Sequence, residues 1–414
     1  MNRKRLLIIG AGEEQVPAYK IALTMGLTVV GSDINPNAPG FHLTGEKIIA
    51  STYDAEETLR EVLKFNEAKP VHGVMTLACD TPVAVALVAK ELGLKGNSIH
   101  TAKLSSDKLL QLHRFRLDNI PIPDFREIQS VEELKRAIDD WGLPMILKPP
   151  DNRGARGVLR LAKPVDMEWA FRESVSNSAK GSIIVQRFIS GDQISSESIV
   201  VSGKAYTAMY SGRNYGLLTK YAPYVIENGG CLPADITKSQ QESLDDIVQR
   251  AVASLGIVDG PLKGDLVLTD KGPVVLEFAS RMGGGYAVSH SIPLTHGVNL
   301  IEQVIRQALG EQLCVRDLRP DYKQSAAIRF FFPDPGVVKE IKGFDNLGGH
   351  NGVVLKRLYV KKGDTVPRIT DHTKRAGCVI AVGKSKDEAE QRVIRAIDSV
   401  RIVTERQPSE KYGK

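Results

Sequence analysis

The stretch that decides the fold is DLVLTDKGPVVLEFASRMGGG, residues 265–285. It holds two apolar runs separated by the polar, glycine-containing sequence of a tight β-hairpin turn. If the hairpin centres on Lys271, Asp265 and Glu277 lie six residues on either side of it and become cross-strand neighbours on one face. The opposite, apolar face is then filled by Leu266, Leu268, Val274 and Leu276.

This carboxylate pair favours a metal site. Two close carboxylates repel each other unless a cation or a proton lies between them, and hard oxygen ligands favour Mg²⁺ over zinc. Arg281 leaves the same strand end as Glu277, and its planar, charged fork suits a carboxylate or a developing acyl-phosphate oxyanion. The alternative for Arg281 is a salt bridge to one of the acids. The triglycine at 283–285 favours a functional role, because backbone without side chains can approach a ligand closely.

A second candidate site begins at Lys148, the end of a strand expected over residues 143–148. The following loop, PPDNRGARG at 149–157, combines flexible glycines with two arginines, so its N–H groups and guanidinium groups could neutralise polyphosphate. No Walker A motif is present, and residues 158–161 resemble a strand, which predicts a hairpin lid. A plain surface turn explains the same residues equally well.

The first hundred residues predict a doubly wound parallel sheet. Strands over 6–9 and 27–33 flank a helix over 16–25, and a further strand over 71–77 precedes a helix over 82–92 with Thr81 as its N-cap. The Gly10-Ala11-Gly12 turn, with Asp33 at the end of the second strand, resembles part of a dinucleotide fingerprint. Gln15 occupies the position of its third glycine, so a tight turn without a dinucleotide is the favoured interpretation.

Three domains are expected. Residues 1–104 form the N-terminal α/β domain with its parallel sheet, and 105–318 form a second, α+β domain with a lid subdomain at about 120–188. Residues 319–414 form a small α+β C-terminal lobe. A helix over 106–117 is expected to open the second domain, before a turn-rich segment with two prolines.

Composition excludes several classes of protein. Hydrophobic residues make up 42% and charged residues 25%, a balance that excludes disorder and fibres. The net charge of +6 over 414 residues is too dilute to predict a nucleic-acid partner. The four cysteines form no C-x-x-C pair, which fits reduced thiols in the cytoplasm. No apolar run approaches the roughly 18 residues of a membrane span, so no membrane partner is expected.

The motifs together resemble the ATP-grasp superfamily of carboxylate–amine ligases. The similarity is carried, in chain order, by Ser106-Asp107-Lys108, Ile120-Pro121-Ile122-Pro123, Ile146-Leu147-Lys148-Pro149, Val185-Gln186-Arg187-Phe188-Ile189 and Leu276-Glu277-Phe278-Ala279-Ser280-Arg281. The pattern Glu-x-Ala-x-Arg-x-Gly-Gly-Gly is most similar to the L-amino-acid ligase branch. The resemblance implies a pre-ATP-grasp N-terminal domain, α+β ATP-grasp domains and a C-terminal lobe that includes residues 376–383.

The resemblance also implies roles for individual residues. Catalysis falls to Arg281 and Lys148, and the metal-binding acids are Asp265 and Glu277, holding one or two Mg²⁺ ions with Mn²⁺ as a substitute. ATP is the nucleotide cofactor, and its contacts are Lys108, Lys148, Arg153, Gly154, Arg156, Gly157, Gln186, Phe188, Ile189 and Gln193. A small-molecule carboxylate and an amine are the expected substrates, and a homodimer is the expected assembly.

Departures from the family pattern keep alternatives open. Gln186 and Gln193 stand where carboxylates are usual, and Ala279 replaces a third metal ligand. One alternative is a bicarbonate-using enzyme of the biotin carboxylase or carbamoyl-phosphate synthetase type, and another is a catalytically decayed nucleotide-binding protein. A third is an NAD(P)-dependent oxidoreductase built on the Gly10 turn. Arg213 and Arg375 are candidates to hold a substrate carboxylate, although ion pairing at the surface is favoured for each.

Overall fold

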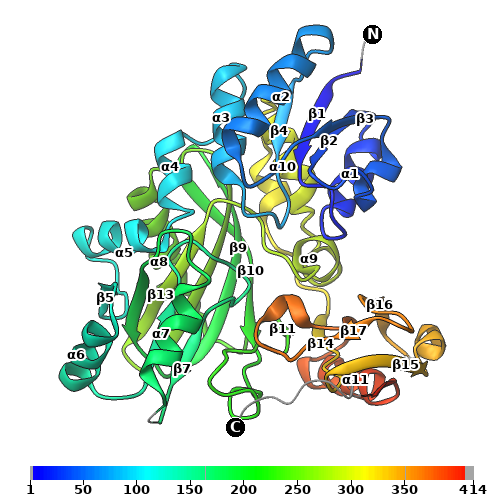
Figure 1. The fold of residues 1–414 in the computed structure, drawn as a ribbon. Coiled ribbons are helices and arrows are strands. Elements are labelled where there is room, and N and C mark those ends of the chain that lie inside the picture. The colour runs from blue at the N-terminus through cyan, green and yellow to red at the C-terminus, as the bar shows by residue number, and fades with distance from the viewer. Residues whose placement is uncertain (1–2, 164, 350, 406–414) are drawn as a thin grey trace. The chain divides into compact units, whose positions relative to one another are not determined.

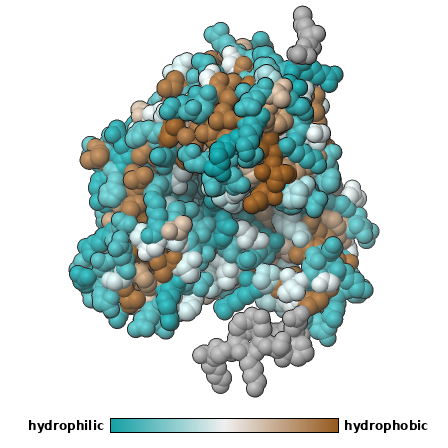
Figure 2. All heavy atoms as spheres, turned by 45° about the horizontal axis from the view of Figure 1, so that its top comes forward, coloured by the Kyte–Doolittle hydropathy of each residue, from teal (hydrophilic) through white to brown (hydrophobic). Residues whose placement is uncertain are grey.

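The computed structural model describes residues 3–163, 165–349 and 351–405. The chain forms two compact units, which are described separately (Figure 1). Unit 1 comprises Met1–Ile122, Gly191–Tyr210 and Asp235–Tyr322. Unit 2 comprises Pro123–Ser190, Ser211–Ala234 and Lys323–Lys414. Figure 2 shows hydrophilic and hydrophobic side chains interspersed on one face.

Unit 1 begins with the expected parallel sheet, whose strand order is β3-β2-β1-β4. The strands are β1 (Arg5–Ile9), β2 (Thr28–Asp33), β3 (Glu46–Ile49) and β4 (Gly73–Met75), and the helices are α1 (Val16–Thr24), α2 (Ala55–Ala68) and α3 (Pro82–Glu91). The β1 side chains from Leu6 to Ile9 are fully buried, as a strand covered on both faces requires. The predicted α/β fold class of this domain is confirmed.

One predicted helix cap and one predicted helix start differ from the structure. Thr81 occupies the N-cap position of α3 but makes no capping bond, because its ψ of 36° is outside the extended region that aims a hydroxyl at the first turn. The helix expected from Ser106 begins at Lys108 as α5 (Lys108–Leu117). There Asp107 is the N-cap, and its carboxylate accepts hydrogen bonds from the backbone N–H groups of Leu109 and Leu110. A carboxylate cap of this kind fixes where the first helical turn starts.

The rest of unit 1 is an antiparallel layer covered by helices. Its strand order is β13-β12-β9-β10. The strands are β9 (Asp192–Val201), β10 (Lys204–Arg213), β12 (Gly260–Thr269) and β13 (Gly272–Ala279), and the helices are α4 (Ile99–Leu104), α8 (Lys238–Leu255), α9 (Ile292–His296) and α10 (Leu300–Ala308). Helix α5 packs on β13, where the Phe115 and Phe278 rings meet edge to face at 6.2 Å. The Gln111 side chain also bonds to both the N–H and the carbonyl of Phe278, which anchors this strand end.

Unit 2 contains an antiparallel sheet of order β5-β8-β6-β7 and further sheets in its C-terminal part. The first sheet consists of β5 (Phe125–Ile128), β6 (Met145–Lys148), β7 (Leu159–Leu161) and β8 (Ile183–Arg187), with helices α6 (Val131–Trp141) and α7 (Met167–Val175). The C-terminal part contains β11 (Gly230–Leu232), β14 (Ser325–Phe330), β15 (Gly336–Lys342), β16 (Val353–Leu358), β17 (Thr365–Val366), β18 (Gly377–Gly383), β19 (Arg401–Glu405) and α11 (Lys386–Asp398). This confirms an α+β lobe.

Candidate active site

The β12–β13 hairpin places Asp265 directly opposite Glu277, as the sequence predicts. The turn is different from the predicted one. A β-bulge follows Asp265, and beyond it Thr269 pairs with Gly272, so the turn consists of residues 270–271 and is not centred on Lys271. The bulge places one extra residue on β13, which compensates for the different turn. Asp265 therefore still lies opposite Glu277.

Because of the bulge, the apolar face of the hairpin differs from the predicted one. Leu266 and Leu268 are buried in β12, as expected, but Val274 and Leu276 in β13 are only half-buried. Val275 is fully buried in their place. Side chains alternate strictly only in a regular strand, and the extra residue shifts the alternation by one position.

Two lysines accompany the acidic pair. Lys108 Nζ lies 3.5 Å from Glu277 Oε2, with the two side chains 12% and 26% exposed. Lys263 Nζ contacts the Asp265 carboxylate. Sequence reasoning found Lys108 and missed Lys263. The signal was available, because Lys263 and Asp265 are two residues apart on one strand and therefore share a face.

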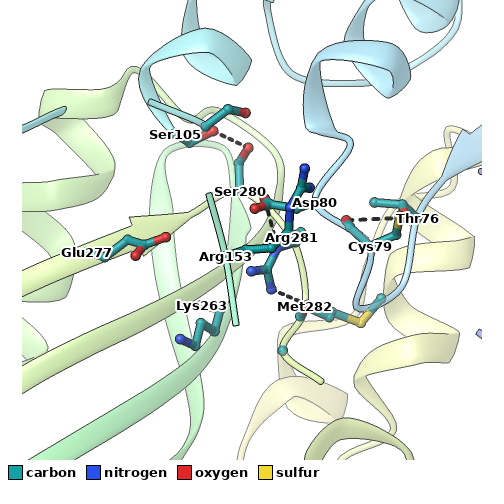
Figure 3. A network of polar contacts seen from close by, with 12 residues as sticks. Thr76, Cys79, Asp80, Ser105, Arg153, Lys263, Glu277, Ser280, Arg281 and Met282 are labelled. Carbon is teal, nitrogen blue, oxygen red and sulfur yellow. Dashed lines mark hydrogen bonds and ion pairs between the residues drawn. The ribbon is translucent and has the colours of Figure 1, made fainter. Parts of the chain in front are cut away.

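Arg281 is paired with Asp80, and neither Asp265 nor Glu277 is its hydrogen-bond partner (Figure 3). The distance from Arg281 Nε to Asp80 Oδ1 is 3.1 Å, and Arg281 Nη1 donates to the carbonyl of Met282. Burial alone would lower the pKa of Arg281, but the charges of Asp80 and Glu277 outweigh it and raise the pKa. The guanidinium therefore stays charged. Asp80 was missed, although it follows the carboxyl end of a parallel strand, where functional residues gather.

The triglycine approaches carboxylates of the protein itself. Gly283 N–H donates to Glu197 Oε2 at 3.1 Å, and Gly285 N–H donates to Glu14 Oε1 at 3.0 Å. A Cβ added to Gly283 would collide with the Glu197 carboxylate, and one added to Gly284 would collide with Glu14. The carboxylates of Glu197 and Glu14 therefore approach this backbone closely, and the approach to a ligand that the sequence predicts stays a prediction.

Glu197 is a buried acid that sequence reasoning missed. It lies on β9 opposite Lys263 and is 2% exposed. Burial raises its pKa to about 7, although the Gly283 N–H, Lys263 and Arg281 each act to lower it. A single Glu among serines gave no signal in the sequence, because only the β9–β12 pairing brings it to the face that carries Lys263 and Asp265. The carboxyl can therefore change its protonation state near neutral pH.

The Gly10 turn is held by the protein's own groups. Asp33 accepts hydrogen bonds from the N–H groups of Ala11 and Asn35, both at 2.9 Å, and Gln15 Nε2 donates to the carbonyl of Leu77. Gly10 has a φ of +98°, which strongly favours glycine. Both Asp33 oxygens are therefore engaged in the turn, which fits the tight-turn interpretation.

In unit 2, Lys148 ends β6 and is 7% exposed. The loop after it has left-handed backbone at Gly154 and Gly157, and the carbonyl of Gly154 accepts from the His372 N–H at 2.9 Å. Arg156 Nε donates to the carbonyl of Arg153, so a hydrogen bond joins the two arginines of the loop. This is the expected connection between two strands, β6 and β7.

The predicted adenine-bordering segment contains an unpaired buried amide. Gln186 is 2% exposed, and within the described part of the chain its Nε2 has no hydrogen-bond partner. Beyond it, the Arg160 guanidinium lies 4.4 Å from the centre of the Phe188 ring, and Ile189 is half-buried. In unit 1, Gln193 lies opposite Val267 on β9 and is also half-buried.

Arg213 and Arg375 form ion pairs, but not at the surface. Both Nη2 atoms lie 3.1 Å from the same Glu227 oxygen, and the Arg side chains are only 18% and 10% exposed. Burial would raise the pKa of Glu227, but Arg213, Arg375 and His372 lower it to about 2. Burial and the charge of Arg375 lower the pKa of His372 to about 3. Two guanidinium groups therefore share the Glu227 carboxylate.

Comparison with known families decides the identity of the fold. Residues 105–285 match the ATP-grasp domain, and residues 329–405 match the L-amino acid ligase C-terminal domain 2. The chain therefore contains an ATP-grasp domain, and its homologues are ATP-grasp ligases. The ATP-grasp match includes the acidic hairpin and Arg281, which the oxidoreductase alternative leaves unexplained.

Several relatives resemble this chain over most of its length. The uncharacterized protein y4rH of Sinorhizobium fredii is 25% identical over 362 residues, covering 84% of this chain and 72% of that protein. Human carnosine synthase 1 is 24% identical over 337 residues, covering 75% of this chain but only 40% of that enzyme. The crystal structure of an L-amino acid ligase from Bacillus licheniformis covers 98% of this chain and 100% of its own, with a TM-score of 0.83 at 21% identity. At this identity the structural likeness shows the fold.

No group of three or more His, Cys, Asp or Glu side chains in the described ranges is arranged to hold a metal ion. Within the same ranges, every helix is too short or too polar to cross a membrane.

Proposed function

We propose that the chain is an ATP- and Mg²⁺-dependent carboxylate–amine ligase that forms an amide, peptide-like bond through an acyl phosphate and releases ADP and phosphate. The observation that carries the proposal is the pairing of Asp265 with Glu277, each next to a lysine, at the strand end from which Arg281 leaves. This arrangement offers metal-binding oxygens, phosphate-binding ammonium groups and a fixed guanidinium within one unit.

The acidic pair fits one magnesium ion. Mg²⁺ is usually held in proteins by one or two carboxylates together with substrate phosphates, and Asp265 and Glu277 provide two carboxylates. Ala279 lies opposite Lys263 and supplies no ligand atom, so the side chains of the hairpin support a second ion poorly. When bound, Mg²⁺ would neutralise charge on the phosphate oxygens. Substitution by Mn²⁺ stays a prediction.

The proposed reaction has two steps. A substrate carboxylate oxygen attacks the γ-phosphorus of ATP, and the bond to the ADP oxygen breaks. The amine then attacks the acyl carbon, loses a proton, and phosphate leaves with the electrons of the C–O bond. Positioning and charge neutralisation dominate catalysis of this kind.

Arg281 and Lys108 are assigned to the developing charges of this reaction. Arg281 stays protonated, and we assign it to the carboxylate and to the oxyanion of the acyl phosphate. Lys108, at the first position of α5, is assigned to phosphate oxygens. Asp80 is a positioning residue in this scheme, because it acts on the substrate through Arg281.

The unit 2 residues are proposed nucleotide contacts. We assign Lys148 to the phosphates of the nucleotide. The loop that bears Arg153, Gly154, Arg156 and Gly157 is assigned to covering these phosphates. The unpaired Nε2 of Gln186 is supporting evidence, because a buried amide donor without a partner is unfavourable and a nucleotide base offers an acceptor. Phe188, Ile189 and Gln193 complete this proposed set.

The substrates are proposed to be amino acids. The named relatives include carnosine synthase 1, a D-alanine–D-alanine ligase and an L-amino acid ligase, and the last two names specify amino acids as the molecules that are ligated. An amino acid as the carboxylate, and an amino acid or another small amine as the acceptor, is therefore the proposed pair. A homodimer stays a prediction.

The decisive experiment measures ADP release with Mg-ATP across amino acids, alone and in pairs, with hydroxylamine in parallel wells. Hydroxamate formation with one amino acid, and ADP release stimulated by one amine, are the expected results. ADP release stimulated by bicarbonate without an organic acid would select the carboxylase-type alternative. ATP binding without turnover for any acid, amine or bicarbonate would select the decayed nucleotide-binding protein.

A further inference from the structure

Lys263 occupies the middle of a small patch on three neighbouring strands of unit 1. In the β12–β13 hairpin its cross-strand partner is Ala279, and the pair of Asp265 and Glu277 lies two residues away on each strand (Figure 3). On the other side of β12, the partner of Lys263 is Glu197 on β9. Residues directly opposite each other share a face of a sheet, as do residues two apart on one strand. All five side chains therefore belong to the same face.

The Lys263 side chain is held beside Asp265. Its Nζ contacts Asp265 Oδ2, and the side chain is only 19% exposed. Its stem lies close to Gly283, where an added Cβ would be 3.4 Å from Lys263 Cγ. Among the residues that the structure describes, Asp265 is the one hydrogen-bond acceptor of the Lys263 ammonium group. An ammonium group has three N–H donors, so this contact leaves two for a ligand.

This patch supports one metal ion better than two. Asp265 and Glu277 provide the carboxylates for one ion, whereas Ala279 provides no ligand atom. Glu197 is a third acid on the same face, but Lys263 lies between it and the acidic pair. A second ion beside the first would therefore meet an ammonium group and a methyl group, and neither of these is a metal ligand.

We propose that Lys263 replaces a second metal ion: beside one Mg²⁺ at Asp265 and Glu277, its ammonium group binds oxygens of the transferring phosphate. This inference rests on the proposed function, because it requires a nucleoside triphosphate at the hairpin. One divalent ion leaves part of the charge of a triphosphate unbalanced, and fixed cations stabilise the charge that spreads over the phosphate oxygens in the transition state. Lys263 donates hydrogen bonds to these oxygens and keeps its protons, so the two steps of the reaction are unchanged.

The number of metal ions bound to the full chain tests this proposal without relying on turnover. Native mass spectrometry with Mn²⁺ and adenylyl imidodiphosphate, an ATP analogue with a non-hydrolysable γ-phosphate link, counts the ions in each nucleotide-bound chain. We expect one ion in the parent protein and two in Lys263→Gln, because an amide oxygen is a metal ligand and an ammonium group is not. Two ions or none in the parent protein, or a single ion in the variant, would overturn the proposal.

Kinetics distinguish a phosphate contact from a purely structural role of Lys263. At low Mg²⁺ we expect kcat for ADP release to fall at least about 100-fold in Lys263→Gln and at most about tenfold in Lys263→Arg, which keeps the charge. High Mg²⁺ should partly restore Lys263→Gln, because a second ion then supplies the missing charge. Lys271→Gln is the matched control, because Lys271 is an exposed lysine in the turn of the same hairpin. A Lys263→Gln enzyme with the kcat of this control, or one that high Mg²⁺ leaves inactive, would overturn the proposal.

The ligase assay separates failure of this inference from failure of the proposed function. A parent chain that binds the analogue with one ion but forms no hydroxamate would contradict the proposed function and still support the role of Lys263. Hydroxamate formation by a parent chain with two ions would contradict the role of Lys263 alone. A chain that binds no analogue would overturn both.

Discussion

Arg281 and Asp80 are 201 positions apart in the sequence, and a 3.1 Å hydrogen bond joins the guanidinium of one to the carboxylate of the other. Both side chains are largely buried, at 13% and 14% exposed. The bond connects the strand end of the acidic hairpin to the loop that follows β4 of the N-terminal sheet (Figure 3). The N-terminal domain therefore helps to fix the direction of the guanidinium that we assign to the substrate carboxylate.

Asp80→Asn tests this positioning role. The variant keeps the shape of the side chain and removes the charge that holds Arg281, so we expect kcat/KM for the carboxylate substrate to fall by about 10- to 100-fold. The KM for ATP should change little, because the effect reaches the substrate through Arg281. Steady-state ADP release at varied carboxylate and ATP concentrations separates the effect on kcat/KM for the carboxylate from the effect on KM for ATP.

The control for this variant is Asp140→Asn, which removes an exposed ion pair with Arg126. An exposed pair contributes little, so its kinetics should equal those of the parent enzyme. An Asp80→Asn enzyme with unchanged kcat/KM, or one in which only the ATP parameters change, would show that Asp80 does not position Arg281.

Glu277→Gln tests the proposed metal-binding role. An amide cannot balance the charge of Mg²⁺ as a carboxylate does, so we expect ADP release to fall at least about 100-fold and half-saturation to need more Mg²⁺. Glu302→Gln, which breaks the partly exposed helix pair with Arg306, is the matched control. The measurement is ADP release against Mg²⁺ concentration; an unchanged Mg²⁺ requirement in Glu277→Gln would contradict the assignment.

Local signals predicted much of this fold. Short apolar runs with helices between them indicated the parallel sheet of β1, β2 and β4, and the spacing of Asp265 and Glu277 gave their cross-strand pairing. These features depend on neighbours close in sequence, which is where periodicity and turn chemistry carry information. The confirmed parts of the prediction are of this kind.

The remaining features depend on contacts between distant segments. Glu197 reaches the site only because β9 pairs with β12, and Asp80 only because the N-terminal domain meets Arg281. The bulge after Asp265 was also missed, because no glycine or proline marks it at Leu276. Strand pairing and domain contact are determined by tertiary packing, so one sequence read by periodicity does not specify them.

Gly283→Ala tests why the triglycine is present. An added Cβ would collide with the Glu197 carboxylate, so we expect the free energy of unfolding to fall by about 1–3 kcal/mol. Gly45→Ala is the matched control, because a Cβ there meets nothing within 4 Å. Urea unfolding of both variants checks the prediction. Equal stability of the two would mean that Glu197 moves aside without cost, and that the close approach at Gly283 has no structural role.

The protonation of Glu197 predicts a pH dependence of stability. Burial raises its pKa from the ordinary 4.5 to about 7, so the folded state binds the proton more tightly than the unfolded state does. The carboxyl therefore contributes stability that is fully present below about pH 4.5 and is lost as the pH rises through about 7, amounting to roughly 3 kcal/mol. Glu197→Gln is neutral at every pH and lacks this contribution. Urea unfolding at pH 5 and pH 8 measures this difference. Between these pH values the parent protein and the Glu302→Gln control should lose more stability than Glu197→Gln does. Equal losses in all three proteins would mean that Glu197 titrates in the ordinary range.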